Sequence, residues 1–259
     1  NSLIPGDPAM RAILNTLLED LQARPDAWQM LVRLAGFPAL EASIDYLREG
    51  IDDAHFFTAK DLLFYRGAVE PAGYHRLSLH PLLAAALQDT HQEEVRAERD
   101  RIHEWLHGFT RENRWNYDLL ETEQANWIGL LDFYQAAEDW DGLVRLMRDV
   151  FNFLRVRGLW QEASRRLDAV LEEPGRLEDD WSRGWAYLHR GILELLHSRD
   201  RQAAAYFDRA DEIFRALDDR AYRGKTLYRR SLITIRQGAV SYTHLRAHET
   251  VLDLVCRLL

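Results

Sequence analysis

Residues 181–217 read WSRGWAYLHRGILELLHSRDRQAAAYFDRADEIFRAL, and this stretch decides the fold class. Apolar residues recur every three or four positions on both sides of Ser198-Arg199-Asp200. This spacing predicts two amphipathic helices, at residues 181–197 and 201–217. Because the break between them is so short, the two helices are expected to pack as a hairpin.

The same pattern occurs forty positions earlier, which indicates an internal repeat. Ala163 and Ala203 hold equivalent places early in the second helix of each hairpin, and Leu167 matches Phe207. The other equivalences are Val170 with Ala210, Met147 with Tyr187 and Leu227, and Phe151 with Gly191 and Ser231. One hairpin cannot bury its apolar face alone, so helices at 142–156, 161–172, 181–197, 201–217 and 221–237 are expected to stack into a solenoid.

The first third of the chain predicts shorter elements. Helices are expected at residues 10–21, 27–34 and 40–48, and Thr58 is expected to cap a fourth that ends at Gly67.

A β signal follows these helices. Pro71-Ala72-Gly73 is typical of a turn, and residues 74–79 alternate at period two, which predicts a small hairpin. Pro81 then begins a closing helix. Short helices, a hairpin and a closing helix describe a winged-helix domain.

The sequence therefore predicts an all-α protein with one small β-hairpin wing. The expected parts are a winged-helix-like domain at 1–90, a linker of long helices (93–113 and 119–137) at 91–139, and helical repeats at 140–238. With 14 Gly and 7 Pro in 259 residues, long stretches are free of helix breakers.

The last residues, 239–259, have a different origin. Read back into codons, VSYTHLRAHET (240–250) and DLVCRLL (253–259) match two elements of a sequencing-library adapter in one frame. The alternative is that ETVLDLVCRLL forms a natural amphipathic helix. On the adapter interpretation, His244, His248 and Cys256 have no functional meaning and the tail is left out of the fold. The chain is then expected to be a piece of a longer protein.

Composition narrows the classes of function. The net charge of −9 argues against nucleic acid as the main partner, because phosphate binding needs a basic surface. No apolar run is long enough to suggest a membrane span, and no signal peptide is visible. The single cysteine lies in the tail, so a disulfide framework is not expected and a cytoplasmic location is.

Small and aromatic residues in the repeats resemble those of tetratricopeptide repeats. Gly191, Ala203, Phe207 and Ala210 fall at the small, small, aromatic and small positions of that family. Three features depart from it: the longer period, Glu194 in place of an aromatic residue, and Arg215 where proline is common. The resemblance implies a surface for protein or peptide binding.

A second resemblance covers most of residues 27–238. YHRLSLHPLLAAAL (74–87) resembles the end of the winged helix in STAND-class signal-transduction ATPases, which include NB-ARC proteins. Residues 123–171 resemble the helical linker and first repeats of bacterial members. In that family a histidine of a Met-His-Asp motif senses the phosphates of ADP, and the matching residue is His80, between Leu79 and Pro81. The alternative is a histidine that satisfies backbone groups where the wing meets the helix. The resemblance implies ATP or ADP with Mg²⁺ for a longer protein whose nucleotide-binding domain lies before Asn1, and no cofactor within this piece.

The string His103-Glu104-Trp105-Leu106-His107 matches H-E-x-x-H, the pattern of zinc metalloproteases. On a helix the two histidines would share a face and could bind Zn²⁺, with Glu104 as a general base. Glu121 or Glu123 could supply a third ligand from the next helix. The alternative is a charged, solvated helix whose other face packs in the core.

In tetratricopeptide solenoids the first helix of each pair lines the binding surface. Transferring these positions by register gives a predicted ligand groove, whose residues are Arg145, Arg148, Asn152, Arg155, Trp185, Lys225, Tyr228 and Arg236. Arginines on one surface of an acidic chain favour an acidic peptide, because guanidinium groups pair well with carboxylates. The alternative is that these side chains are simply solvated.

Three functions follow from the sequence. The first is non-catalytic sensing and relay within a STAND-type ATPase, in which the repeats bind a signal and the winged helix passes it to the nucleotide-binding domain. The second is a stand-alone repeat scaffold for protein–protein interaction. The third is a zinc hydrolase that uses His103 and His107.

Overall fold

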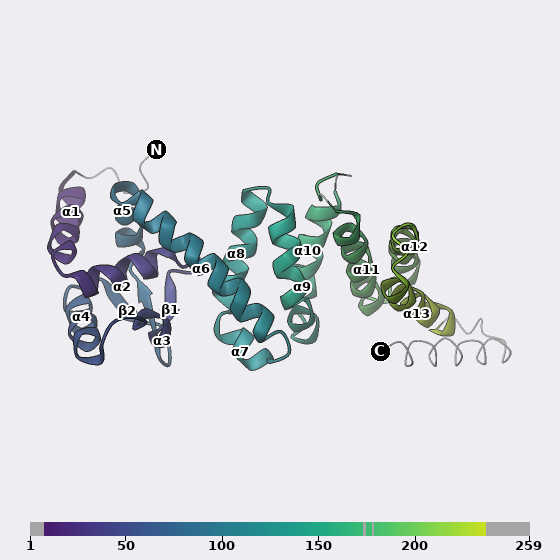
Figure 1. Ribbon diagram of the computed structural model, residues 1–259, viewed down its shortest axis with the longest axis horizontal. Helices are drawn as coiled ribbons and strands as arrows, with labels where there is room; N and C mark the ends of the chain where they lie inside the picture. Colours follow the sequence, from purple (N-terminus) through teal and green to yellow (C-terminus); the bar gives the residue numbers. More distant parts are fainter. Residues whose placement is uncertain (1–7, 173–174, 178, 237–259) are drawn as a thin grey trace. The chain divides into compact units, whose positions relative to one another are not determined.

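The computed structural model describes residues 8–172, 175–177 and 179–236. They are mostly helical, with a small antiparallel sheet, as the sequence predicts (Figure 1). The chain divides into two compact units, Asn1–Asp132 and Phe133–Leu259, each with its own core. The predicted adapter-derived residues, including His244, His248 and Cys256, lie outside the described residues. Within the described part, no helix is long and apolar enough to cross a membrane.

The first unit begins with short helices and strands. Their bounds are α1 (Pro8–Gln22), α2 (Pro25–Gly36), β1 (Glu41–Ser43), α3 (Ile44–Leu47), α4 (Asp53–Tyr65), β2 (Val69–Pro71), β3 (Arg76–Leu79) and α5 (Pro81–Thr90). From α2 onward the order helix, strand, helix, helix, strand, strand is that of a winged helix. The strands form one sheet in the order β1-β3-β2, and both pairs are antiparallel.

Longer helices follow in the same unit. They are α6 (Gln92–Glu112), α7 (Tyr117–Thr122) and α8 (Gln124–Ala136), and α8 continues past the boundary at Asp132. Helix α6 packs along α2 and α5 (Figure 1). Gly36 of α2 makes this approach possible, because a Cβ there would lie 2.7 Å from the Ile102 side chain. The part predicted as a winged helix and the start of the predicted linker therefore share one core.

Three details of the predicted helices are wrong. Residues 40–48 are not one helix: Ala42 pairs with Leu77 in the sheet, and Ser43 then caps the single-turn helix α3. Thr58 does not begin α4, because Asp52 accepts hydrogen bonds from the first amides of that helix. Thr58 lies inside the helix and its hydroxyl donates to the Ala54 carbonyl.

The third detail is the predicted helix at 119–137, which is broken at Glu123 into α7 and α8. Asn116 caps α7, while the side chain of Glu123 lies buried against the wing strand β3. The break therefore positions an ionic contact that is described below.

The second unit is a succession of helices, α9 (Trp140–Val156), α10 (Trp160–Leu171), α11 (Asp180–Leu196), α12 (Asp200–Ala216) and α13 (Arg220–Arg236). Each packs against the next along the chain (Figure 1). The first helices of successive hairpins also contact one another, α9 with α11 and α11 with α13. This is the stacking that the forty-residue repeat predicts.

The repeat positions are explained by close helix crossings. Ala163 and Ala203 are fully buried, as are Leu167 and Phe207. A Cβ at Gly191 would lie 2.6 Å from the Phe207 ring, so only glycine lets α11 and α12 approach this closely. The register weakens in α13, where Leu227 is 41% exposed although its equivalent Met147 is buried.

Glu194, which departs from the tetratricopeptide pattern, has an ionic role in α11. It pairs with Arg190 on the preceding turn, and Arg190 also donates to Asp168 of α10 at 2.6 Å. Arg190 and Glu194 are both buried, and each opposes the charge of the other; Asp168 adds a second carboxylate beside Arg190, and Arg199 lies 3.6 Å from the second oxygen of Glu194. This network connects the hairpin α9–α10 to the hairpin α11–α12.

Candidate functional site

His80 lies where the wing meets helix α5. Its Nδ1 accepts a hydrogen bond from the Leu82 amide at 3.2 Å, and Pro81 follows as the first helical residue. The backbone amide of His80 donates to the Ala68 carbonyl at 3.1 Å. His80 is therefore the N-cap of α5, and its Nε2 is the ring atom that remains for another contact.

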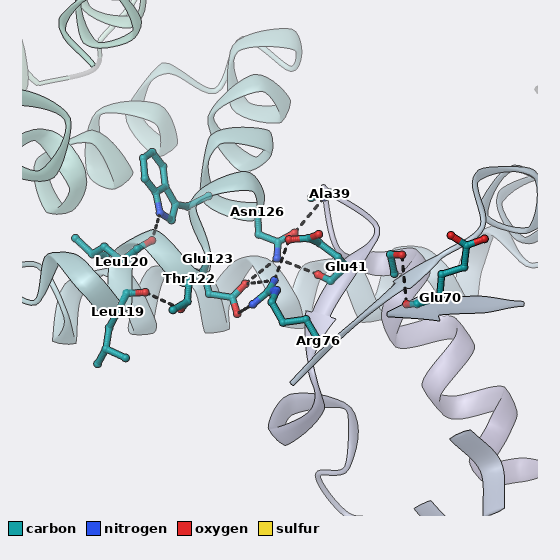
Figure 2. Close-up of polar contacts among 11 residues, drawn as sticks. Ala39, Glu41, Glu70, Arg76, Leu119, Leu120, Thr122, Glu123 and Asn126 are labelled. Atoms are coloured by element: carbon teal, nitrogen blue, oxygen red, sulfur yellow. Dashed lines mark hydrogen bonds and ion pairs between the residues drawn. The ribbon is translucent and has the colours of Figure 1, made fainter. Parts of the chain in front are cut away.

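A buried ionic contact joins the wing strand β3 to helices α7 and α8 (Figure 2). Arg76 donates from Nη1 to Glu123 Oε1 at 2.6 Å and from Nη2 to Glu123 Oε2 at 3.1 Å. Its Nη2 also lies 3.3 Å from Glu41 Oε1. Asn126 Nδ2 donates to Glu123 Oε2 at 2.7 Å and to the Glu41 carbonyl at 3.0 Å. We call these four residues the Arg76 clamp.

The residues of the Arg76 clamp are largely buried, and its carboxylates offset the effect of burial on the Arg76 guanidinium. Glu123 is 3% exposed and Asn126 is fully buried. Burial alone would lower the pKa of Arg76, but the Glu123 and Glu41 carboxylates raise it, so the guanidinium stays charged. The clamp therefore fixes the wing to the helices that follow it.

The H-E-x-x-H residues lie on α6, and no third ligand is grouped with them in the described part of the chain. His103 and His107 are both buried, whereas Glu104 is exposed on another side of the helix. Burial, and then the nearby Arg99, lower the pKa of His103 to about 4. Among the described residues, no three His, Cys, Asp or Glu side chains are grouped to hold a metal, and Glu123 is bound to Arg76. The proposed third ligand from α7 or α8 is therefore not in place.

All of the predicted groove residues lie on the first helices of the repeats, α9, α11 and α13. Five cations there have no carboxylate partner within the described part of the chain: Arg145, Arg148 and Arg155 on α9, and Lys225 and Arg229 on α13. Arg190, Arg223 and Arg230 on these first helices differ, since each forms an ion pair. We call the five cations, together with Asn152 and the aromatic side chains of Trp181 and Tyr222, the basic face.

One end of the basic face alternates cations with aromatic rings. The Arg148 guanidinium lies 4.5 Å from the Trp181 ring centre, and Lys225 Nζ lies 4.2 Å from that of Tyr222. The two rings meet edge to face, with centres 4.9 Å apart. Asp219 accepts the indole N–H of Trp181 at 3.0 Å, which holds that ring in place. Arg148 and Lys225 are thus supported by a rigid aromatic pair.

The other end of the basic face surrounds His189. Its ring stacks on Trp185 with centres 4.0 Å apart and meets Phe151 edge to face at 4.5 Å. The pKa of His189 is lowered to about 3, chiefly by burial and also by Arg229, Lys225 and Arg155, although its hydrogen bond to the Trp185 backbone opposes the shift. Burial and the neighbouring Arg155 also lower the pKa of Arg229.

Three cations therefore converge on one neutral histidine. Its Nδ1 makes a 2.8 Å hydrogen bond with the Trp185 carbonyl, which can only accept, so the proton is on Nδ1. Like charges on one surface repel one another, and an anion bound among them would lower that repulsion.

One of the predicted groove residues is wrong, and another already has a carboxylate partner. Trp185 is 3% exposed and packs on Phe151, so it supports the surface from beneath and does not line it. Arg236 is not a free cation, because it donates to the Leu195 carbonyl and pairs with Asp200, each at 3.2 Å. Tyr228 is 45% exposed beside Arg229, as expected of a surface residue.

The sequence reasoning missed His189 and Arg229. His189 follows Trp185 by four positions and Arg229 follows Lys225 by four, so each shares a helical face with a residue that was predicted. That spacing is a signal by which both could have been found.

Comparisons with known proteins give no relatives: no family model, curated protein or solved structure matches this chain.

Proposed function

We propose that this chain is a non-catalytic binding module whose repeats capture an acidic segment of a partner protein on the basic face. The observation that carries the proposal is the group of five cations without carboxylate partners in a chain of net charge −9. In such a chain, five positive charges without carboxylate partners on α9 and α13, which both contact α11, create a local field opposite in sign to the net charge.

The chemistry of the basic face favours carboxylates. Arginine guanidinium groups bind carboxylates through two parallel hydrogen bonds. All three cations that α9 contributes to the basic face are arginines. The rings of Trp181 and Tyr222 offer apolar surface between the charges. An extended peptide with Asp or Glu beside an aromatic or aliphatic residue matches both features.

We further propose that binding at the repeats is relayed to a nucleotide-binding domain of a STAND-type ATPase. The order of winged-helix-like part, linker and repeats supports this role, as does the position of His80 at the start of α5. The Nε2 of His80 is the atom that would contact a phosphate of ADP, because Nδ1 is used in the helix cap. The Arg76 clamp would carry a movement of the wing to α7 and α8.

The binding test uses a fluorescently labelled, unstructured Asp/Glu-rich peptide and the whole chain. Fluorescence anisotropy is expected to show binding that weakens as salt is raised, since the contacts are between charges near the surface. Replacing Arg148 and Arg155 by Glu is expected to abolish it. The matched control replaces Arg201 and Arg209 of α12 by Glu, which changes the net charge equally away from the basic face.

Two results would contradict the peptide proposal. One is equal affinity in the Arg148→Glu/Arg155→Glu variant and in the control. The other is binding of a single-stranded oligonucleotide in preference to the peptide, because this would mean that the basic face recognises phosphates.

The second candidate function is a repeat scaffold that never had a nucleotide-binding domain, and it shares the same basic face. The relay and the scaffold differ in what they require of His80, because a scaffold needs this residue only as the N-cap of α5. In a longer protein with the ATPase domain, His80→Asn would keep the cap but lose the imidazole. Altered ADP release in that variant would support the relay, and unchanged release would support the scaffold.

A further inference from the structure

The first unit contains a cleft of about 560 Å³ that is independent of the basic face. Its walls come from α2, from the segment that includes α3, and from α6. A volume of this size is in the range of small-molecule sites. Three aromatic side chains line it, Trp28, Tyr46 and Trp105, and each is only partly buried.

The aromatic walls are held in fixed orientations. Tyr46 and Trp105 meet edge to face with centres 4.9 Å apart, and Phe37 packs behind both. The Trp28 indole N–H donates to Glu94 at 2.9 Å, so this ring and a carboxylate are fixed side by side. Ring faces carry negative electrostatic potential and attract cations.

The charges that line the cleft are unbalanced. Three carboxylates line it, Glu49, Glu94 and Glu98, against two guanidinium groups, Arg33 and Arg101. Both guanidinium groups already have partners. Arg33 donates to the Leu47 carbonyl at 2.7 Å and lies 4.0 Å from Glu98, and Arg101 donates to Glu98 at 3.0 Å.

Glu98 is thus neutralised within the cleft, whereas Glu49 and Glu94 have no cationic partner there. Tyr46 contributes no charge, because burial and then Glu98 raise the pKa of its phenol. The charged groups that line the cleft therefore sum to a net charge of −1, next to the three aromatic rings.

We propose that this cleft binds an organic cation with apolar substituents, such as an alkylated ammonium group. The cation lies against the rings of Trp28, Tyr46 and Trp105, and its charge is opposed by Glu94 and Glu49. An inorganic cation lacks the apolar surface that the rings would cover, and an anion meets an excess of carboxylates.

The test is an NMR titration of the whole chain with choline, read from the indole N–H signals of Trp28 and Trp105. Both signals are expected to shift and to saturate, with a dissociation constant on the order of 1 mM. The control ligand is the neutral isostere of choline in which a tert-butyl group replaces trimethylammonium. It has the same shape without the charge, and is expected to bind about tenfold more weakly.

Matched variants locate the site. Trp28→Leu is expected to weaken choline binding at least about fivefold, whereas Trp115→Leu, an exposed tryptophan of the same unit outside the cleft, is expected to leave it unchanged. Glu94→Gln keeps an acceptor for the Trp28 indole and removes only the charge, so it is expected to weaken choline but not the neutral isostere. Equal binding of the two ligands, choline binding that survives Trp28→Leu, or no shift at high millimolar choline would each overturn the proposal.

Discussion

Removing the carboxylate of Glu123 tests how strongly the wing is fixed to the helices that follow. Glu123 is 3% exposed and accepts two hydrogen bonds from Arg76 and one from Asn126. Glu123→Met leaves the Arg76 guanidinium with only Glu41, at 3.3 Å. Because a buried charge that loses its partner is costly, the free energy of unfolding is expected to fall by about 3–5 kcal/mol.

A double-mutant cycle separates the pair from its surroundings. Arg76→Met alone is expected to destabilise the first unit similarly, because Glu123 then stays buried without its guanidinium. The double variant, with neither charge, is expected to lose less than the sum by at least about 2 kcal/mol. Arg48→Met is the control, since Arg48 forms an exposed pair with Asp53 at 3.5 Å and should matter by less than about 1 kcal/mol.

Hydrogen exchange followed by mass spectrometry is the suitable assay, because it reports each unit separately. Faster exchange is expected in β3, α7 and α8, with no change in α12. If Glu123→Met costs no more than Arg48→Met, or if the two single effects simply add, the reasoning about the Arg76 clamp is wrong.

Three further predictions concern pH, helix packing and the helix cap. Burial holds the pKa of His103 at about 4 instead of the usual 6.5, so the stability from its neutral form is complete above pH 6.5 and is lost as the pH falls towards 4. Buried His189, whose pKa is lowered to about 3, contributes a further loss over the same range. Urea unfolding at both pH values should therefore show a loss that is about 3 kcal/mol smaller in His103→Gln than in the parent chain. Gly191→Ala should destabilise the second unit by about 1–3 kcal/mol in thermal unfolding, because its Cβ meets the Phe207 ring. Gly108→Ala is the control, because its Cβ meets open space, and it should stabilise α6 by about 0.5–1 kcal/mol. Equal effects of the two substitutions would contradict the close crossing of α11 and α12. His80→Ala should lower the free energy of unfolding by about 1 kcal/mol, because the α5 cap is lost, and His80→Asn should lower it much less. Urea titration measures the difference, and equal losses in the two variants would contradict the capping role.

Most helices could be predicted from local sequence, because their signals are local. The apolar spacing of residues 181–217 and the turn residues between them give both helices to within one or two positions. Strand β1 could not be predicted in this way. Glu41–Ser43 is a strand only because β3 pairs with it from more than thirty residues further along the chain.

The candidate sites could likewise be predicted only where the sequence signal is local. The free cations of α9 could be found by register, because α9 repeats the spacing of the later first helices. Register could not show that Trp185 is covered by Phe151 or that Arg236 reaches Asp200, since both depend on how neighbouring helices pack. Similarly, the Arg76 clamp joins residues from two strands, from the break between α7 and α8 and from α8, which no local pattern connects.

The most direct test of the central claim is an NMR titration of the whole chain with the Asp/Glu-rich peptide. The indole N–H signal of Trp181, which lies beneath Arg148 on the basic face, is the main probe. Trp115 of the first unit is the reference. A saturable shift of the Trp181 signal is expected, which Arg148→Glu/Arg155→Glu removes, while the Trp115 signal stays unchanged. A Trp181 signal that does not move at saturating peptide, or moves equally in that variant, would contradict it.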